Sequence, residues 1–121
     1  MTNAELNEAV AKTLGMKLIT MLPGQPKAVA PRGSNGEPLP WRMAPDWATS
    51  VDDCLRDLLP VMHDKGFELA MEENQTRDED ETPLLRVWWV GAYRGMKPTA
   101  HHAEDHSLAR AICLVFLEVM K

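Results

Sequence analysis

Apolar residues recur at helical spacing in three segments of this chain, and the last of these is apolar on nearly all sides. Residues 107–121 contain only three charged side chains, those of Arg110, Glu118 and Lys121. A surface helix has a polar face, so a helix without one must be covered from more than one direction. We therefore expect a C-terminal helix that lies in the core of a layered domain or in a subunit interface.

The other two helical segments carry signals for their ends. In the first, Thr2 and Glu5 match a capping box, and Gly15 supplies a left-handed residue after the last turn. The second begins near Ser50, and Pro60 predicts a kink or a broken last turn rather than loss of the helix. Its expected apolar face consists of Val51, Cys54, Leu55, Leu58, Leu59 and Met62, and its expected polar face of Asp52, Arg56 and Asp57.

Two segments between the second and the last helix have the patterns of β-strands. Residues 67–72 alternate between the two faces of a half-buried strand, and residues 84–93 are apolar on both faces and rich in aromatic side chains. Residues 74–82 contain four consecutive acidic residues, 78–81, and are expected to form a solvated hairpin loop between these strands. The sequence also allows one further strand, in residues 16–22 or in residues 27–30.

Residues 23–46 are rich in proline and glycine. Because proline lacks the N–H that a central strand donates, we expect little regular structure in this segment. Trp41 and Trp47 favour a fixed wrap in which large side chains anchor the loop by burial. The predicted fold class is an α+β sandwich, a small antiparallel sheet packed against helices with the C-terminal helix central, and a chain of 121 residues is expected to form one domain, 1–121.

Composition narrows the classes of function. The net charge is −5, which disfavours direct binding to nucleic acid or to anionic membranes, because phosphates attract basic surfaces. The N-terminus lacks the basic start and apolar stretch of a signal peptide, and no apolar run is long enough to span a membrane.

Cys54 and Cys113 lie among apolar residues and are expected to be buried thiols in a reducing compartment. We expect a cytoplasmic protein.

The candidate chemistry of single residues is sparse. His101, His102 and His106 lie at the expected start of the last helix. If the helix begins early enough to include them, His102 and His106 share a face at the i, i+4 spacing of zinc ligands. Two neighbouring ligands are not a site, and a polar helix entrance explains this segment equally well. Both cysteines are expected to be buried, where a thiol is unreactive. We therefore expect no catalytic residue, no metal and no cofactor.

Aromatic and charged residues are the candidates for binding. The chain has four tryptophans, Trp41, Trp47, Trp88 and Trp89, interleaved with Arg42, Arg86 and Arg94. Adjacent residues of a strand point to opposite faces, so one of Trp88 and Trp89 is a candidate for an exposed contact. Burial in the core and a pocket that stacks a nucleotide base are the other two interpretations.

The run of acids at Asp78, Glu79, Asp80 and Glu81 is the second candidate for binding. It could imitate the phosphates of a nucleic acid for a protein that binds them. A solvated loop that keeps a hairpin soluble explains the same residues. Residues 94–98 lack the spacing of a phosphate-binding loop and predict a turn.

Three stretches carry a resemblance to a known family. They are the opening helix of residues 1–11 that ends at Gly15, the sequence Pro-Asp-Trp-Ala-Thr-Ser at 45–50 with its following helix and Lys-Gly-Phe at 65–67, and Ala-Arg-Ala-Ile-Cys-Leu at 109–114. The chain resembles the phage ABA sandwich domain family over residues 1–15 and 40–121. The resemblance implies an α/β sandwich and a bacteriophage or prophage origin. It implies no catalytic set, and residues 23–40 and 75–82 depart from the pattern.

The expected function follows from this setting. We expect a non-enzymatic phage accessory protein that binds a host protein or protein complex, with inhibition of a host defence system such as CRISPR–Cas as one option. Its expected binding residues are Trp41, Arg42, Trp47, Asp78, Glu79, Asp80, Glu81, Trp88, Trp89 and Arg94. The alternative is a small-ligand binder that sequesters a signalling nucleotide through Trp41, Arg42 and Arg94. Homodimerisation through the apolar last helix is a further option.

Overall fold

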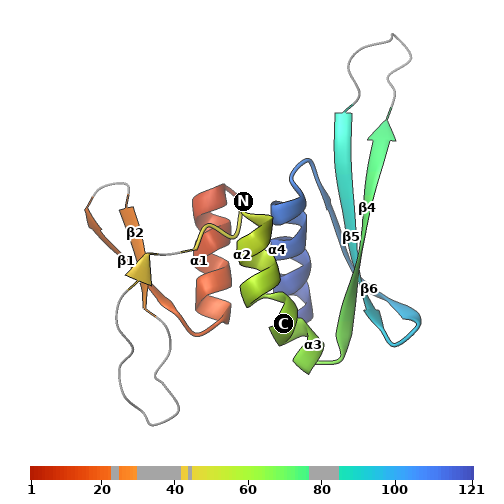
Figure 1. The fold of residues 1–121 in the computed structure, drawn as a ribbon, viewed down its shortest axis with the longest axis horizontal. Helices are drawn as coiled ribbons and strands as arrows, with labels where there is room; N and C mark the ends of the chain where they lie inside the picture. Colours follow the sequence, from red (N-terminus) through yellow and green to blue (C-terminus); the bar gives the residue numbers. More distant parts are fainter. Residues whose placement is uncertain (23–24, 30–41, 44, 77–84) are drawn as a thin grey trace.

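Ten elements make up the fold of the computed structural model, which describes residues 1–22, 25–29, 42–43, 45–76 and 85–121, and the side chains of 1–16, 45–73 and 87–121 (Figure 1). They are α1 (Asn3–Thr13), β1 (Lys17–Leu22), β2 (Gln25–Val29), β3 (Arg42–Met43), α2 (Val51–Asp57), α3 (Leu59–Asp64), β4 (Phe67–Thr76), β5 (Leu85–Arg94), β6 (Lys97–Asp105) and α4 (Leu108–Val119).

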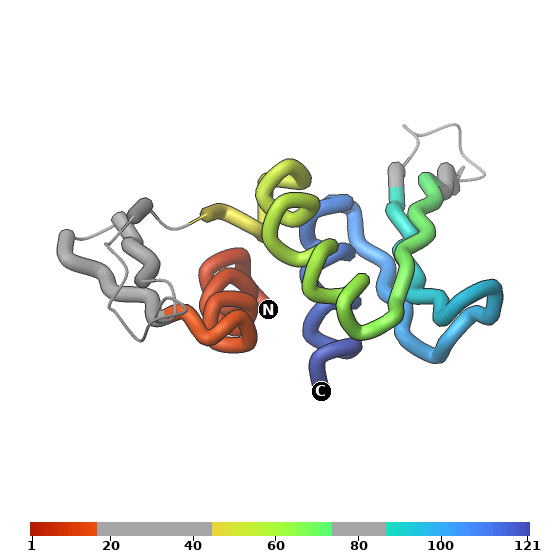
Figure 2. The backbone as a smooth tube through the Cα atoms, turned by 60° about the horizontal axis from the view of Figure 1, so that its bottom comes forward, coloured from red at the N-terminus to blue at the C-terminus, as the bar shows by residue number. Residues whose placement is uncertain are grey.

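The strands form two antiparallel sheets on either side of the helices. The larger sheet has the order β4-β5-β6, and the smaller has the order β1-β2-β3. Helix α4 packs on β5 and β6, while α1 and α2 pack on α4 from its other sides (Figures 1 and 2). The smaller sheet lies beside α1 (Figure 1). This arrangement confirms the predicted α+β fold with an antiparallel sheet packed against helices and a central C-terminal helix.

Helix α4 is covered on most of its circumference. Its buried residues are Ala109, Ala111, Ile112, Cys113, Val115, Phe116 and Val119. Leu108, Leu114 and Leu117 are partly buried and also pack against this core. The side chain of Ser107 caps the helix by accepting a hydrogen bond from the backbone N–H of Arg110. The prediction that residues 107–120 form the centre of the domain is confirmed.

The predicted ends of the first helix are also confirmed. The hydroxyl of Thr2 accepts a hydrogen bond from the Glu5 N–H at 3.1 Å, and the Glu5 carboxylate accepts one from the Thr2 N–H at 3.2 Å. Gly15 follows the helix with a φ of 78°, a conformation that costs little without a Cβ atom. The apolar residues Leu6 and Val10 are fully buried against the core.

The second predicted helix is two short helices. Ser50 caps α2 by accepting a hydrogen bond from the Asp53 N–H at 3.2 Å, and Pro60 lies in the first turn of α3 after the break. The broken last turn predicted from Pro60 is therefore confirmed. Leu55, expected on the buried face, is 39% exposed. Asp57, expected on the polar face, is largely buried because it binds an indole, as described below.

The strand β6 is absent from the sequence prediction, which places its residues at the entrance of the last helix. Gly95, with a φ of 66°, lies in a tight turn that returns the chain so that Lys97 pairs with Arg94. Residues 97–105 then alternate in burial, as in a half-buried strand. His101 and His102 therefore belong to β6, and His106 precedes α4. The predicted i, i+4 helical face of His102 and His106 is wrong.

The expectation of little regular structure in residues 23–46 is wrong for the parts that the structure describes. β2 pairs with both β1 and β3, so it is the central strand of the smaller sheet. Pro26 pairs with Thr20 close to a register shift, at the end of the ladder, where a missing N–H disturbs the pairing least. The sequence allowed one further strand in residues 16–22 or 27–30, and the structure has a strand in both places, β1 at Lys17–Leu22 and β2 at Gln25–Val29.

Candidate functional site

The two faces of the larger sheet differ in what covers them. Val90 and Ala92 in the central strand β5 are buried and face α4, so Trp88 points to the same side by the alternation of a strand. Trp89, Gly91 and Tyr93 point to the other side. Within the described ranges, the helices lie on one side of this sheet, and none covers the side of Trp89 (Figures 1 and 2).

We call the uncovered side the open face. Its residues are Glu68, Ala70 and Glu72 of β4, Val87, Trp89, Gly91 and Tyr93 of β5, and Pro98, His102 and Glu104 of β6. The expectation that Trp88 and Trp89 point to opposite faces agrees with this register. Both are partly buried, and only Trp89 belongs to the open face.

Strand pairing places acids on both sides of Trp89. Glu72 of β4 and Glu104 of β6 are its direct cross-strand neighbours. Both glutamates are exposed. Directly opposed residues have Cβ atoms about 4.5–5.5 Å apart, so both acidic side chains start next to that of Trp89. Tyr93 has Glu68 as its neighbour on β4, which adds a third exposed acid to the same face.

The indole of Trp89 lies flat on the sheet because Gly91 has no side chain. A Cβ atom at Gly91 would lie 2.3 Å from Cη2 and 2.7 Å from Cζ2 of this ring. The ring of His102 is stacked with it, with a centroid distance of 6.3 Å and an angle of 24° between the planes. One side of the indole is thus against the backbone of β5, and the opposite side faces outward. The ring therefore lies over Gly91, while Glu72 and Glu104 flank Trp89 on the neighbouring strands.

Arg94 belongs to the other end and the other side of the sheet. Its guanidinium lies 4.7 Å from the centroid of the Phe67 ring, in a cation–π arrangement. His101 contacts the same ring edge-on at a centroid distance of 5.9 Å. A shallow pocket of about 160 Å³ near this point is lined by His63, Gly66, Phe67 and Glu68. This volume is below the roughly 300–1,000 Å³ that is usual for small-molecule sites.

The structure does not join Arg94 with Arg42. Arg42 is described only as part of the backbone of β3, in the smaller sheet, whereas Arg94 ends β5 in the larger one. The helices lie between these sheets (Figure 1). The third member of the expected nucleotide pocket, Trp41, lies outside the described residues, as do Asp78, Glu79, Asp80 and Glu81 of the expected acidic loop.

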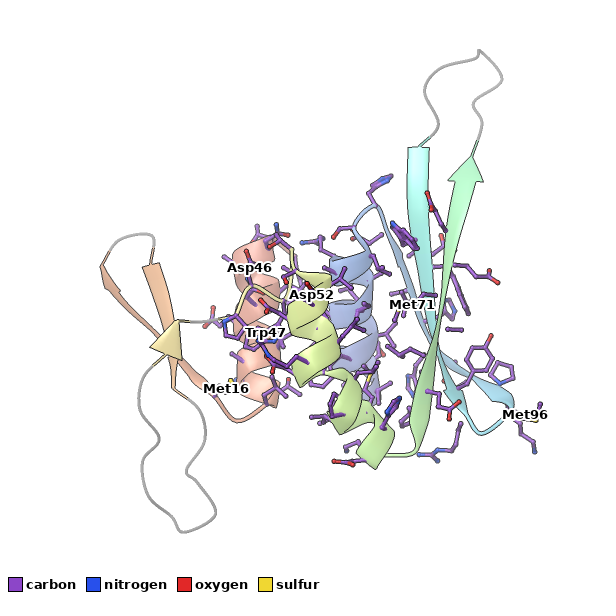
Figure 3. The ribbon with its side chains drawn as sticks, viewed as in Figure 1. Met16, Asp46, Trp47, Asp52, Met71 and Met96 are labelled. Carbon is purple, nitrogen blue, oxygen red and sulfur yellow. The ribbon has the colours of Figure 1, made fainter. Side chains whose placement is uncertain are left out.

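Trp47 is in the core and is removed from any contact surface. It is 0% exposed, and its Nε1 donates a hydrogen bond to Oδ2 of Asp57 at 2.9 Å. Figure 3 shows Trp47 beside α1 and α2. The backbone next to it is held by Asn7 of α1, whose Oδ1 accepts a hydrogen bond from the Ala48 N–H at 2.8 Å. The expected anchoring role of Trp47 is confirmed, and its expected role in binding does not fit this burial.

The two cysteines are free and buried, as expected. Their sulfur atoms are 3.8 Å apart, and the Cys54 thiol lies 3.0 Å from the carbonyl oxygen of Trp47. The hydrogen bond with Cys54, together with burial, raises the pKa of the Cys113 thiol well above its ordinary value. A thiol that stays protonated is a poor nucleophile. This pair therefore acts as core packing.

No metal-binding group appears within the described ranges. In these ranges, no three histidine, cysteine, aspartate or glutamate side chains come together in a group that could hold a metal ion. In the same ranges, none of the helices has the length and apolar character needed to cross a membrane.

Several residues of the open face were missed by sequence reasoning. Glu72 and Glu104 are ordinary exposed acids in sequence, and they flank Trp89 only because β4 and β6 both pair with β5 in this register. The one available signal was Gly91 two residues after Trp89, since a glycine inside a strand often marks a close approach to the backbone.

Comparison of the chain with protein-family models, with curated proteins and with solved structures finds no match in any of the three. The resemblance to the phage ABA sandwich domain family therefore stays a prediction.

Proposed function

We propose that this chain is a non-enzymatic protein that binds another protein through the open face, with Trp89 at the centre of the contact. The observation that carries the proposal is the position of Trp89, which lies flat on Gly91 on a side of the sheet that no described helix covers. Tryptophan and tyrosine are enriched among the residues that contribute most to binding energy at protein interfaces. Trp89 and Tyr93 share this face, and exposed polar residues surround them.

The arrangement has the composition of an interface. An aromatic centre with a charged rim is the usual anatomy of a protein contact. The exposed carboxylates of Glu68, Glu72 and Glu104 form part of such a rim. The small pocket near Phe67 has less volume than the usual small-molecule site, so this pocket does not support the alternative of nucleotide sequestration.

The biological setting is part of the proposal and is supported by the resemblance alone. In this setting the chain is a phage accessory protein in the cytoplasm of the host cell. Its partner is a host protein or complex, and inhibition of a defence system such as CRISPR–Cas is the consequence of binding. The acidic residues Asp78–Glu81, which lie outside the described residues, add four negative charges to the sequence between β4 and β5.

The proposal is tested by comparing variants in affinity capture from host lysate, followed by titration of the captured protein. Trp89→Ala should remove binding and leave the chain folded. Trp47→Phe is the matched control, because it changes a tryptophan of the core and leaves the open face intact. Binding that survives Trp89→Ala contradicts the proposed surface. A thermal shift of several degrees with a cyclic or linear nucleotide, combined with no captured protein, favours the nucleotide alternative.

A further inference from the structure

The row of residues across the larger sheet at Trp89 has a definite chemical preference. Glu72, Trp89 and Glu104 are paired across three adjacent strands, so the residue that carries the indole has an acid as its direct neighbour on each side. Neither glutamate has an ion pair or hydrogen-bond partner for its side chain in the part of the chain that the structure describes. Both carboxylates are thus available to a ligand, and both carry the same sign of charge.

We propose that the open face binds an arginine side chain of the partner protein, with the guanidinium on the indole of Trp89 and its N–H groups directed to Glu72 and Glu104. This inference rests on the proposed function, because it names the chemistry of the partner at the same face. A tryptophan ring is the best aromatic surface for a cation. The outward side of the Trp89 indole is the side left open by its packing on Gly91.

The geometry favours arginine over lysine. A guanidinium is planar, stacks on an aromatic ring and presents several N–H donors in its plane, which suits acceptors on opposite sides of the ring. An ammonium is compact and strongly hydrated, so that it loses more solvation on a flat ring.

The charge of the surroundings supports a basic partner. Glu68 lies next to Tyr93 on the same face, and the whole chain has a net charge of −5. The like charges of Glu72 and Glu104 on the two sides of Trp89 repel each other, and a bound cation relieves this repulsion. Charge complementarity of this kind fixes the partner and its register.

The experiment uses the full chain and short synthetic peptides. The probe is a nine-residue peptide in which three arginines alternate with threonine and serine. The same peptide with lysine in place of arginine and with glutamate in place of arginine are the comparisons. Calorimetric titration should show the arginine peptide binding several-fold more tightly than the lysine peptide, and no binding of the glutamate peptide. Affinity should weaken as salt is added, since exposed charges are screened.

Variants of Glu72, Trp89 and Glu104 test whether the peptide binds at these three residues. Trp89→Ala should weaken binding of the arginine peptide about tenfold, the value expected from loss of a cation–π contact of about 1.4 kcal/mol. Glu72→Gln and Glu104→Gln should each weaken it several-fold. Glu8→Gln is the matched control, because it removes one exposed acid from α1 and should leave the affinity unchanged. If Trp89→Ala unfolds the chain, Trp89→Phe keeps a ring and should give an intermediate loss.

Three outcomes overturn the inference. Equal affinity for the arginine and lysine peptides, with no effect of the Trp89 variants, means that the chain recognises only the net charge of the peptide. No binding of the arginine peptide, while capture of a protein still depends on Trp89, leaves the proposed function standing and removes arginine as the ligand. Self-association in sedimentation that disappears on Trp89→Ala assigns the open face to a second copy of the chain.

Discussion

Replacement of Trp47 by alanine should lower the free energy of unfolding by about 3–5 kcal/mol, the usual cost of removing a fully buried tryptophan side chain. Trp47 is 0% exposed and packs in the main core cluster. The variant also loses the hydrogen bond to Asp57, which contributes about 1 kcal/mol in a typical case. Asp57 keeps two hydrogen bonds from Arg56, both at 2.9 Å, so the substitution does not leave its carboxylate without a partner.

This loss is large in comparison with the total. A domain of 121 residues at about 0.05–0.15 kcal/mol per residue has a free energy of unfolding of about 6–18 kcal/mol. Trp47→Phe keeps most of the ring and removes the indole N–H, so about 1–2 kcal/mol is expected for it. The two variants together separate the loss of volume from the loss of the hydrogen bond.

The assay is urea unfolding followed by far-ultraviolet circular dichroism, which does not depend on the tryptophan that is replaced. With an m-value of about 1–3 kcal/mol/M, Trp47→Ala should move the midpoint down by more than 1 M. A loss below about 1 kcal/mol at an unchanged m-value would contradict the burial of Trp47 and its anchoring of the 45–50 segment. A changed m-value would mean that the variant alters the unfolded or native ensemble instead.

Three further predictions test other features of the structure. Gly91→Ala should displace the Trp89 ring, because the added Cβ would collide with it, and should therefore reduce partner binding. The free energy of unfolding should change by less than about 1 kcal/mol, because alanine is more favourable than glycine within a strand. Titration of the partner measures the first effect, and urea unfolding of the same sample measures the second. The Cys113 thiol, with its raised pKa, should react with iodoacetamide at neutral pH far more slowly in the native chain than in urea, and equal rates would show that it is accessible. The hydrogen bonds from Thr2 lower the pKa of Glu5, so the stabilisation by this carboxylate is present above its unfolded-state pKa and is lost as the pH falls through its lower native pKa. Thermal unfolding of the native chain and Glu5→Gln should therefore differ at neutral pH and converge in acid, and a difference that persists in acid would contradict the pKa direction.

Features that depend on residues close together in the sequence were predicted, and features that depend on distant residues were missed. The capping box of Thr2 and Glu5 and the break at Pro60 were predicted because they depend on residues within one or two turns. The strand β6 was missed because its half-buried positions include His101 and Asp105, which are polar, so that its alternation is not visible as apolar periodicity. Its backbone forms a strand because β5 offers it hydrogen-bond partners.

The candidate site was predicted in part for the same reason. The opposite directions of Trp88 and Trp89 follow from the geometry of any strand, and this could be predicted without a structure. The choice of Trp89 as the residue of the open face required the position of α4, which covers the side of Val90. The burial of Trp47 was one of three interpretations until its hydrogen bond to Asp57 and its packing decided among them.

The sequence by itself determined the helix ends, the strands β4 and β5, and the central place of α4, because local hydrogen bonding and the burial of apolar side chains are specified by neighbours along the chain. Only the tertiary structure decided that Glu72 and Glu104 lie on either side of Trp89 and that the indole rests on Gly91. Those neighbours come from three different strands, and their proximity is set by the register of strand pairing, which a single stretch of sequence does not contain.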